Sequence, residues 1–143
     1  MVTYDLFSYS NAGRTNCSEI VIPDAEVFLY PTLLSYHEAD QLFDTLKKNI
    51  IWEKQKIKLY GEVHDVPRLT AWYGDPNKSY IYSGIKLNTN PWNAALLKIR
   101  EKIEKISKTK FNSVLLNLYR SGADSVSWHS DDEPELGQNP VIG

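Results

Sequence analysis

Apolar residues recur every three or four positions in two stretches of the chain, which is the period of an amphipathic helix. The first stretch carries Ala39, Leu42, Phe43 and Leu46. Ser35 and Glu38 stand three residues apart at its start, where a serine and a glutamate can satisfy two unpaired backbone N–H groups of a helix. We therefore predict a helix from Tyr36 to Lys48.

The second apolar stretch carries Trp92, Leu96, Ile99, Ile103 and Ile106, with lysine, arginine and glutamate between them. Asn90 followed by Pro91 is typical of the N-cap and first turn of a helix. The pattern predicts an amphipathic helix of about four turns that starts at Asn90 and packs its apolar stripe on a sheet. Its charged side chains are expected to form a solvated face.

Alternation of polar and apolar residues predicts strands between and before these helices. The expected strands are residues 26–30, 63–66 and 80–82, and the expected turns are Tyr60-Gly61-Glu62 and Gly74-Asp75-Pro76-Asn77. A further strand before the Tyr60 turn has a basic side made of Lys54, Lys56 and Lys58. Overall, residues 51–82 read as strands and turns.

Two further strands are predicted near the end of the sequence. On residues 113–119, Asn117 and Tyr119 lie on the same face, because side chains two apart in a strand point the same way. On a second strand over residues 126–131, His129 and Asp131 share a face for the same reason. The two polar stripes can therefore line one cavity.

Size and composition indicate one folded domain over residues 1–143, with a loosely ordered lead-in over residues 1–18. The formal charge of −2 gives no overall attraction to nucleic acid, so any phosphate contact needs a local basic face. A single cysteine excludes a disulfide framework and favours a reducing compartment. There is neither a bilayer-spanning stretch nor a secretory signal pattern. We expect a cytoplasmic protein, or a nuclear one in a eukaryote, with no membrane partner.

His129 and Asp131 are the candidate metal ligands. A histidine and a carboxylate, with a second histidine from elsewhere, are the protein ligands of the non-haem Fe(II) oxygenases. Asn117 and Tyr119 on the preceding strand have matching parity, and both can donate hydrogen bonds to a carboxylate. The acidic run 131–133 is costly unless a cation neutralises part of it. The alternative is a surface histidine hydrogen-bonded to a nearby carboxylate.

A third metal ligand is not evident from the pattern. His37 falls in the first turn of a predicted surface helix and His64 on a half-exposed strand, and no histidine follows His129. Serine-nucleophile chemistry is poorly supported because the chain has no Gly-x-Ser-x-Gly elbow. A phosphate-cradling glycine loop is missing as well.

Several longer motifs extend the His-x-Asp signal. They are Val66-Pro67-Arg68, Trp72-Tyr73-Gly74-Asp75, Tyr80-Ile81-Tyr82-Ser83-Gly84, Pro91-Trp92, residues 111–119 and residues 129–136. In these motifs, from about Phe28 to the last residue, the chain resembles the AlkB family of Fe(II)- and 2-oxoglutarate-dependent dioxygenases. It is similar in particular to members that reverse alkylation damage in DNA.

The resemblance implies a role for each matching residue. His129 and Asp131 would be iron ligands, and Asn117 and Tyr119 would hold 2-oxoglutarate. The residues expected to shape the pocket for a flipped base are Arg68, Tyr80, Ser83, Asp132 and Glu133. Tyr60 falls where repair members carry a finger hairpin, whose aromatic side chain fills the gap left in the duplex.

The resemblance also implies a fold and an activity. The expected fold is α+β, with N-terminal helices and lid hairpins packed on a jelly-roll (double-stranded β-helix) sheet. Residues 19–110 would form the substrate-recognition lid and supporting helices, and residues 111–143 the first strands of the dioxygenase core. The expected activity is oxidative demethylation of 1-methyladenine- and 3-methylcytosine-type bases in DNA, using Fe(II), 2-oxoglutarate and O₂. The expected partner is DNA that carries alkylated bases.

One departure from the family pattern bears on activity. Family members continue past Ile142 with strands that supply the distal histidine and the arginines that clamp 2-oxoglutarate. We therefore expect a C-terminally truncated core whose open sheet edges lower its stability or cause self-association. Two alternatives stay open: a non-catalytic module that binds nucleic acid or protein, and a 2-oxoglutarate oxygenase that acts on RNA, protein or lipid.

Overall fold

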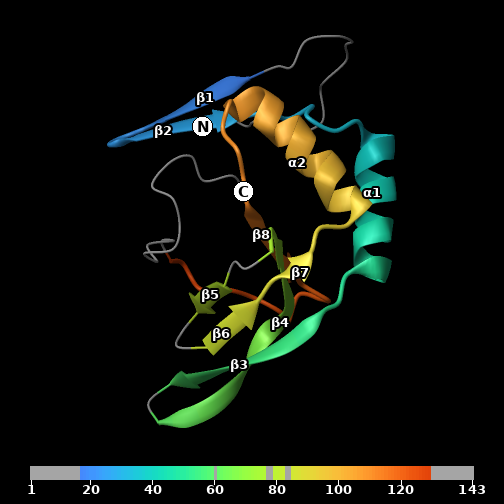
Figure 1. Ribbon diagram of the computed structural model, residues 1–143. Helices are drawn as coiled ribbons and strands as arrows, with labels where there is room; N and C mark the ends of the chain where they lie inside the picture. Colours follow the sequence, from blue (N-terminus) through green and yellow to red (C-terminus); the bar gives the residue numbers. More distant parts are fainter. Residues whose placement is uncertain (1–16, 60, 77–78, 83–84, 130–143) are drawn as a thin grey trace. The chain divides into compact units, whose positions relative to one another are not determined.

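The computed structural model describes residues 17–59, 61–76, 79–82 and 85–129 (Figure 1). The chain divides into two compact units, Met1–Asp40 and Gln41–Gly143. Helices and antiparallel strands occur together, which confirms the predicted α+β class. Within the described ranges, no helix is long and apolar enough to cross a membrane.

The first unit contains a β-hairpin and the start of a helix. Strand β1 (Ser18–Ile22) pairs antiparallel with β2 (Ala25–Leu29), and Asp24 in the connecting turn adopts a left-handed φ of 59°. Aspartate tolerates this conformation better than most residues, which suits it to a tight hairpin turn. The prediction found β2 but missed β1, because it ended the loosely ordered lead-in at the residue where β1 begins.

Helix α1 (Tyr36–Asn49) starts as the sequence predicted and extends one residue further. The Glu38 N–H donates to Ser35 Oγ at 3.3 Å, and the Ser35 N–H donates to Glu38 Oε2 at 3.3 Å. This reciprocal pair confirms the capping box. The Ile50 N–H still donates to the Leu46 carbonyl at 3.0 Å, so the helix runs directly into the core of the second unit.

The second unit is built around one long central strand. Strand β4 (Glu62–Gly74) pairs antiparallel with β3 (Glu53–Leu59) and β8 (Ser113–Leu118), and parallel with β7 (Asn90–Pro91). Leu59 pairs with Glu62, and Gly61 between them has a φ of 89°, which glycine adopts without steric cost. The turn predicted at this position is confirmed, although Tyr60 lies outside the described residues.

A wide irregularity interrupts the β3–β4 ladder in the middle of β4. Lys54 pairs with Leu69 while Lys56 pairs with Asp65, so residues 66–68 of β4 stand against the single residue Gln55 of β3. Pro67 lies in this bulge, where its missing N–H breaks no ladder hydrogen bond. Arg68 is the last residue of the bulge.

A separate two-stranded sheet follows β4. Strand β5 (Ser79–Tyr82) pairs antiparallel with β6 (Ile85–Asn88). The prediction of a strand over residues 80–82 is confirmed, whereas β6 was missed. The turn between the two strands lies outside the described residues.

The N-cap of helix α2 (Ala94–Ser107) lies three residues later than predicted. The N-cap is Asn93, whose Oδ1 accepts the Leu96 N–H at 2.9 Å, and not Asn90. The predicted start was wrong because Asn90 and Pro91 are used by β7, where the Asn90 side chain donates to the Trp72 carbonyl at 3.2 Å. Two asparagines close together both fit a cap, and sheet pairing decides between them.

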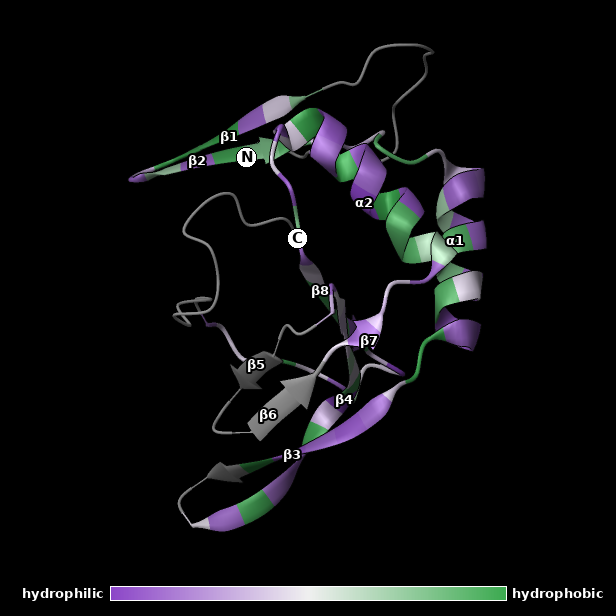
Figure 2. Cartoon of the chain, in the orientation of Figure 1, coloured by the Kyte–Doolittle hydropathy of each residue, from purple (hydrophilic) through white to green (hydrophobic). Residues whose placement is uncertain are grey.

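The core of the second unit lies between the helices and one face of the β4–β8 sheet. Its buried members are Ile50, Ala71, Tyr73 and Leu96, and the partly buried residues around them are Leu46, Trp52, Trp92, Val114 and Leu116. Figure 2 shows the corresponding alternation of hydrophobic and hydrophilic positions along α2. Since Ala71 and Tyr73 face the helices, Arg68, Thr70 and Trp72 face the opposite side of the sheet.

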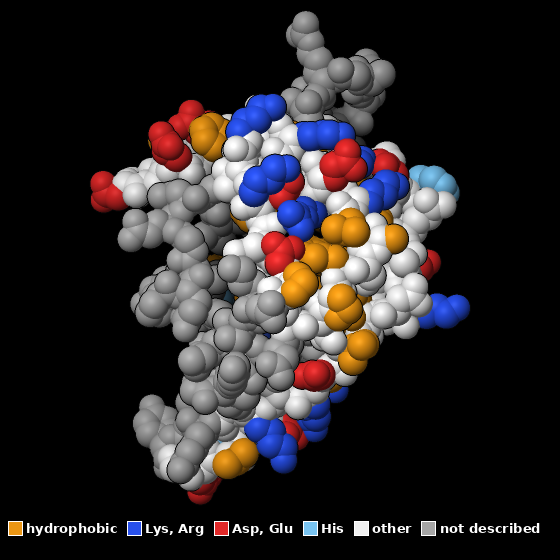
Figure 3. Space-filling view, viewed as in Figure 1, with side chains coloured by type: hydrophobic (Ala, Val, Ile, Leu, Met, Phe, Trp, Pro, Cys, Tyr) orange, Lys and Arg blue, Asp and Glu red, His pale blue; other side chains and the backbone are white. Residues whose placement is uncertain are grey.

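A polar network ties α2 to the strands next to it. Arg100 Nε donates to Glu104 Oε1 at 2.9 Å, and the same carboxylate accepts the Phe111 N–H at 3.0 Å just before β8. Three donors in all, including Lys110 Nζ, lower the pKa of Glu104 to about 2. Figure 3 shows basic and acidic side chains interspersed on the visible surface, as expected of a solvated charged face.

Candidate active site

The sheet face turned away from the helices carries the polar side chains that could bind a ligand or take part in catalysis. On β4, Arg68 (8% exposed) and Thr70 (2% exposed) are buried. On β8, Asn117 stands directly opposite Thr70, and Leu115 opposite Trp72. Directly opposed residues of antiparallel strands point to the same face, so these side chains form one patch.

Arg68 and Asn117 are joined within this patch. Arg68 Nε donates to Asn117 Oδ1 at 2.9 Å, from a guanidinium that is almost fully buried. Among the residues that the structure describes, no carboxylate forms an ion pair with Arg68. A buried charge without a countercharge is costly, so this arginine is suited to attract an anion. Its expected role in the base pocket stays a prediction.

The loop after β8 is folded into a compact turn. Arg120 donates to both oxygens of Asp124 at 2.7 Å, and the Asp124 N–H donates to the Ser121 carbonyl at 3.1 Å. The Asp124 side chain is only 7% exposed, and its hydrogen bonds with Arg120 lower its pKa to about 2. The turn thus brings the chain back toward the sheet.

The end of this loop is docked on the β4 bulge. The Ser125 N–H donates to the Pro67 carbonyl at 2.9 Å, and Arg68 Nη1 lies 3.5 Å from the Ser125 carbonyl. One guanidinium therefore reaches both Asn117 on β8 and the segment that leads to His129. No sequence pattern predicted this docking, because it joins residues 58 positions apart.

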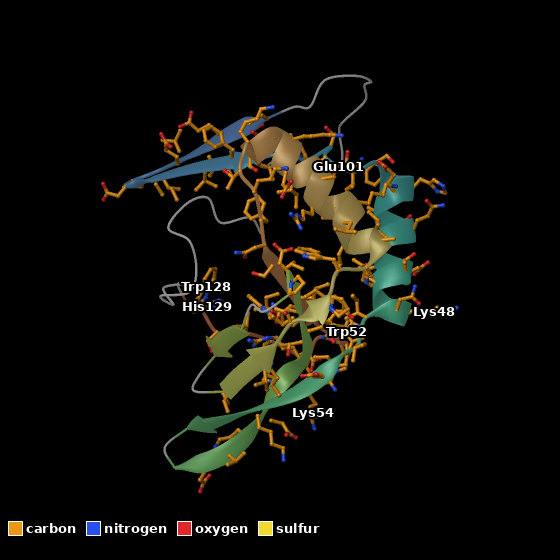
Figure 4. All side chains as sticks on the ribbon, viewed as in Figure 1. Lys48, Trp52, Lys54, Glu101, Trp128 and His129 are labelled. Atoms are coloured by element: carbon orange, nitrogen blue, oxygen red, sulfur yellow. The ribbon has the colours of Figure 1, made fainter. Side chains whose placement is uncertain are left out.

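The segment that carries His129 is not a strand in the structure. Residues 126–129 have no ladder partner among the described residues, so the strand predicted over residues 126–131 is wrong for this part. Alternation in the sequence fits a strand, but a strand also needs a neighbour to accept its hydrogen bonds. Asp131 lies outside the described residues. Trp128 and His129 are both exposed (Figure 4).

His129 itself fits a role as a metal ligand. Nδ1 lies 2.8 Å from the Ser127 carbonyl, and because a carbonyl only accepts, Nδ1 carries the proton. A histidine whose Nδ1–H donates to a carbonyl can bind a metal through Nε2. No cluster of three or more metal-binding side chains occurs within residues 17–129 as far as they are described.

The remaining predicted site residues are placed only in part. Tyr119 follows β8 and is 44% exposed. The backbone of Tyr80 belongs to β5, but its side chain is not described. The predicted residues outside the described ranges are Tyr60, Ser83, Asp131, Asp132 and Glu133. His37 and His64, which the sequence pattern does not favour as a third metal ligand, are exposed.

The row of lysines on β3 is partly neutralised. Lys54 forms an ion pair with Asp65 of β4, which lowers the pKa of that carboxyl. Lys54 and Lys56 are both exposed on β3, and both lower the pKa of Asp65. The predicted basic face is therefore weaker than the sequence suggests.

The chain is similar to known proteins over most of its length. The sequence profile of the 2OG-Fe(II) oxygenase superfamily matches residues 26–143. Alpha-ketoglutarate-dependent dioxygenase alkB homolog 3 is 44% identical over 120 residues in Bos taurus and 42% identical in Homo sapiens, covering 82% of this chain. The chain belongs to the 2OG-Fe(II) oxygenase superfamily and, within it, to the AlkB family.

A second relative is similar over nearly the same region. DNA oxidative demethylase ALKBH2 of Homo sapiens is 36% identical over 116 residues, which are 79% of this chain and 44% of that protein. The matches to alkB homolog 3 cover 41% of the bovine and human proteins. The chain thus spans less than half the length of these relatives.

Proposed function

We propose that the protein is an Fe(II)- and 2-oxoglutarate-dependent dioxygenase that removes methyl groups from alkylated bases in DNA. One observation carries the proposal: Arg68 joins Asn117, a predicted 2-oxoglutarate residue, and reaches the docked loop that leads to His129. The likeness to proteins named as alkB homolog 3 and as DNA oxidative demethylase supports it.

The residues that would hold the cofactors are those of the two polar stripes. His129 and Asp131 would bind Fe(II), and Asn117 and Tyr119 would bind 2-oxoglutarate. When bound, iron and 2-oxoglutarate would activate O₂: one oxygen atom would hydroxylate an N-methyl carbon, and the other would oxidise 2-oxoglutarate to succinate and CO₂. The hydroxymethyl product would break down to formaldehyde and the repaired base. The chain itself must position these groups and keep water away.

Several features of the described residues suit that task. Asn117 offers an amide N–H₂ group from an ordered strand, because Arg68 occupies its oxygen. The buried face formed with Thr70 and Trp72 keeps water from one side of the site. The Arg120–Asp124 turn limits the freedom of the segment that carries His129.

Substrate choice is proposed from the sequence. 1-Methyladenine and 3-methylcytosine carry positive charge near neutral pH, and Asp132 and Glu133 would attract such bases by Coulomb forces. Their methyl group lies on the pairing edge and cannot be reached in a duplex, so the nucleotide must flip out. The β3–β4 hairpin would support the opened duplex. Tyr60, between the two strands in the sequence, is the aromatic residue proposed to fill the gap.

The test is a demethylation assay on the intact protein with Fe(II) and 2-oxoglutarate. Oligonucleotides containing 3-methylcytosine should lose the methyl group with matching release of succinate, as measured by mass spectrometry. His129→Ala should abolish the reaction, whereas His37→Ala, on the exposed surface of α1, should leave it unchanged. Equal rates for both variants would contradict the proposal. Succinate release with methylated RNA alone would favour an RNA substrate.

A further inference from the structure

Arg68 is an unusual residue for the middle of a sheet. Its guanidinium is buried, and its shortest hydrogen bond goes to the neutral oxygen of an amide, Asn117 Oδ1, at 2.9 Å. Arg68 is the last residue of the bulge at residues 66–68. Its other hydrogen-bond partner in the described structure, the Ser125 carbonyl at 3.5 Å, is neutral as well. Burying a charge among neutral partners is unfavourable unless the arrangement serves a ligand.

The chemistry of the pair fixes the orientation of the amide. An arginine side chain has only donors, so it must face the oxygen of Asn117 and never the nitrogen. The Nδ2–H₂ group of Asn117 is then turned away from Arg68. Without this contact an amide can rotate by half a turn and offer its oxygen in place of its nitrogen.

The neighbour of Asn117 does not supply this constraint. Thr70 stands directly opposite on β4, but its hydroxyl has no hydrogen-bond partner in the described structure. Asn117 is itself exposed, so its nitrogen is accessible. The hydrogen bond from Arg68 is therefore the interaction that holds the amide.

We propose that Arg68 is a positioning residue that turns the Nδ2–H₂ group of Asn117 toward bound 2-oxoglutarate. This inference rests on the proposed function, in which Asn117 binds that ligand. The oxygens of 2-oxoglutarate only accept hydrogen bonds, so a wrongly turned amide would repel them. Arg68 thus acts on affinity for the co-substrate through Asn117, and not as a catalytic residue.

The experiment measures the affinity of the intact protein for 2-oxoglutarate by calorimetry, with Mn(II) as a redox-inert substitute for Fe(II). The variants are Arg68→Met, which removes the donor, and Arg68→Lys, which keeps a donor-only cation. Each is made alone and in the Asn117→Ala background. Arg100→Met is the matched control, because Arg100 makes a similar 2.9 Å bond to Glu104 on α2.

Arg68→Met should weaken 2-oxoglutarate binding about tenfold or more, the usual effect of losing a charge-assisted hydrogen bond. Arg68→Lys should keep most of the affinity. In the Asn117→Ala background, Arg68→Met should have little further effect. Mn(II) affinity should change little, because Ser125 keeps its own 2.9 Å bond to Pro67. Arg100→Met should not alter co-substrate affinity.

Two results would overturn the inference while the proposed function stands. One is unchanged affinity in Arg68→Met. The other is the same loss in both backgrounds, which would mean that Arg68 acts on the ligand directly by its charge. Failure of the unsubstituted protein to bind 2-oxoglutarate with Mn(II) would instead overturn the proposed function, and the inference with it.

Discussion

The Arg120 guanidinium binds both carboxylate oxygens of Asp124, and the Arg120 backbone N–H donates to the same carboxylate at 2.9 Å. A planar guanidinium matches a carboxylate in two parallel hydrogen bonds, which is among the strongest side-chain pairings. Because Asp124 is almost fully covered, the pair closes the turn between β8 and the segment of His129. The Arg120–Asp124 pair thereby stabilises the loop internally, and the hydrogen bond from the Ser125 N–H to the Pro67 carbonyl attaches it to the sheet.

Asp124→Asn should loosen this loop. An amide keeps one acceptor oxygen but loses the charge and the two-oxygen match to Arg120. We expect faster hydrogen exchange at the Ser125 N–H, which donates to Pro67, and weaker metal binding at His129. The measurement is amide exchange by NMR. Asp44→Asn, on the exposed side of α1, is the control and should leave Ser125 unchanged.

The free energy of unfolding should fall in acid, because two carboxylates, Asp124 and Glu104, have lowered pKa values in the folded protein. Asp124 and Glu104 have pKa values lowered to about 2, from ordinary values of 3.8 and 4.5. A lowered pKa in the folded state adds stability that is fully present above the ordinary pKa. This added stability is lost as the pH falls from the ordinary pKa toward 2. Urea unfolding midpoints should therefore drop over this range, and Glu104→Gln should flatten part of the fall. An unchanged profile in that variant would argue against the Glu104 network.

Gly74 should not tolerate a side chain. A Cβ at this position would lie 2.8 Å from the Asn112 carbonyl oxygen and 2.9 Å from Ser113 Cβ, closer than atoms can approach. Gly74→Ala should destabilise the protein by about 1–3 kcal/mol, because β8 must shift away from β4. Gly122→Ala is the matched control, since its Cβ would meet nothing within 4 Å. Equal unfolding midpoints for the two variants would show that β8 packs less closely than described.

Thr70→Val should be neutral or stabilising. The Thr70 hydroxyl is buried and has no partner among the described residues, so it bears the cost of leaving water without a compensating bond. Valine has the same shape without the hydroxyl, and we expect a gain of up to about 1 kcal/mol in unfolding free energy. Chemical denaturation measures this directly. A clear loss of stability would mean that the hydroxyl is hydrogen-bonded in solution.

Local patterns predicted local structure well. The capping box at Ser35 and Glu38, the strand at 113–118 and the turn at Gly61 depend on residues close in sequence, and all three are present. The predicted start of α2 was wrong because Asn90 and Asn93 fit the sequence preference of a helix N-cap equally well. Only the pairing of β7 with β4 separates them.

The sequence predicts candidate site residues but not the contacts between them. Asn117 and His129 stood out by spacing on the chain, whereas the bond between Arg68 and Asn117 joins residues 49 positions apart. The docking of Ser125 on Pro67 likewise depends on a bulge that no short sequence pattern predicts. His129 was expected on a strand, since alternation cannot show whether a partner strand is present to pair with it.

The central claim is that this chain binds Fe(II) and 2-oxoglutarate together at His129. An α-keto acid chelated to Fe(II) gives a visible charge-transfer absorption, so the direct measurement is an anaerobic titration of the intact protein with both. We predict that the band appears with the unsubstituted protein and with His37→Ala, and is lost in His129→Ala. A band of equal intensity in His129→Ala, or no band in the unsubstituted protein, would contradict this account.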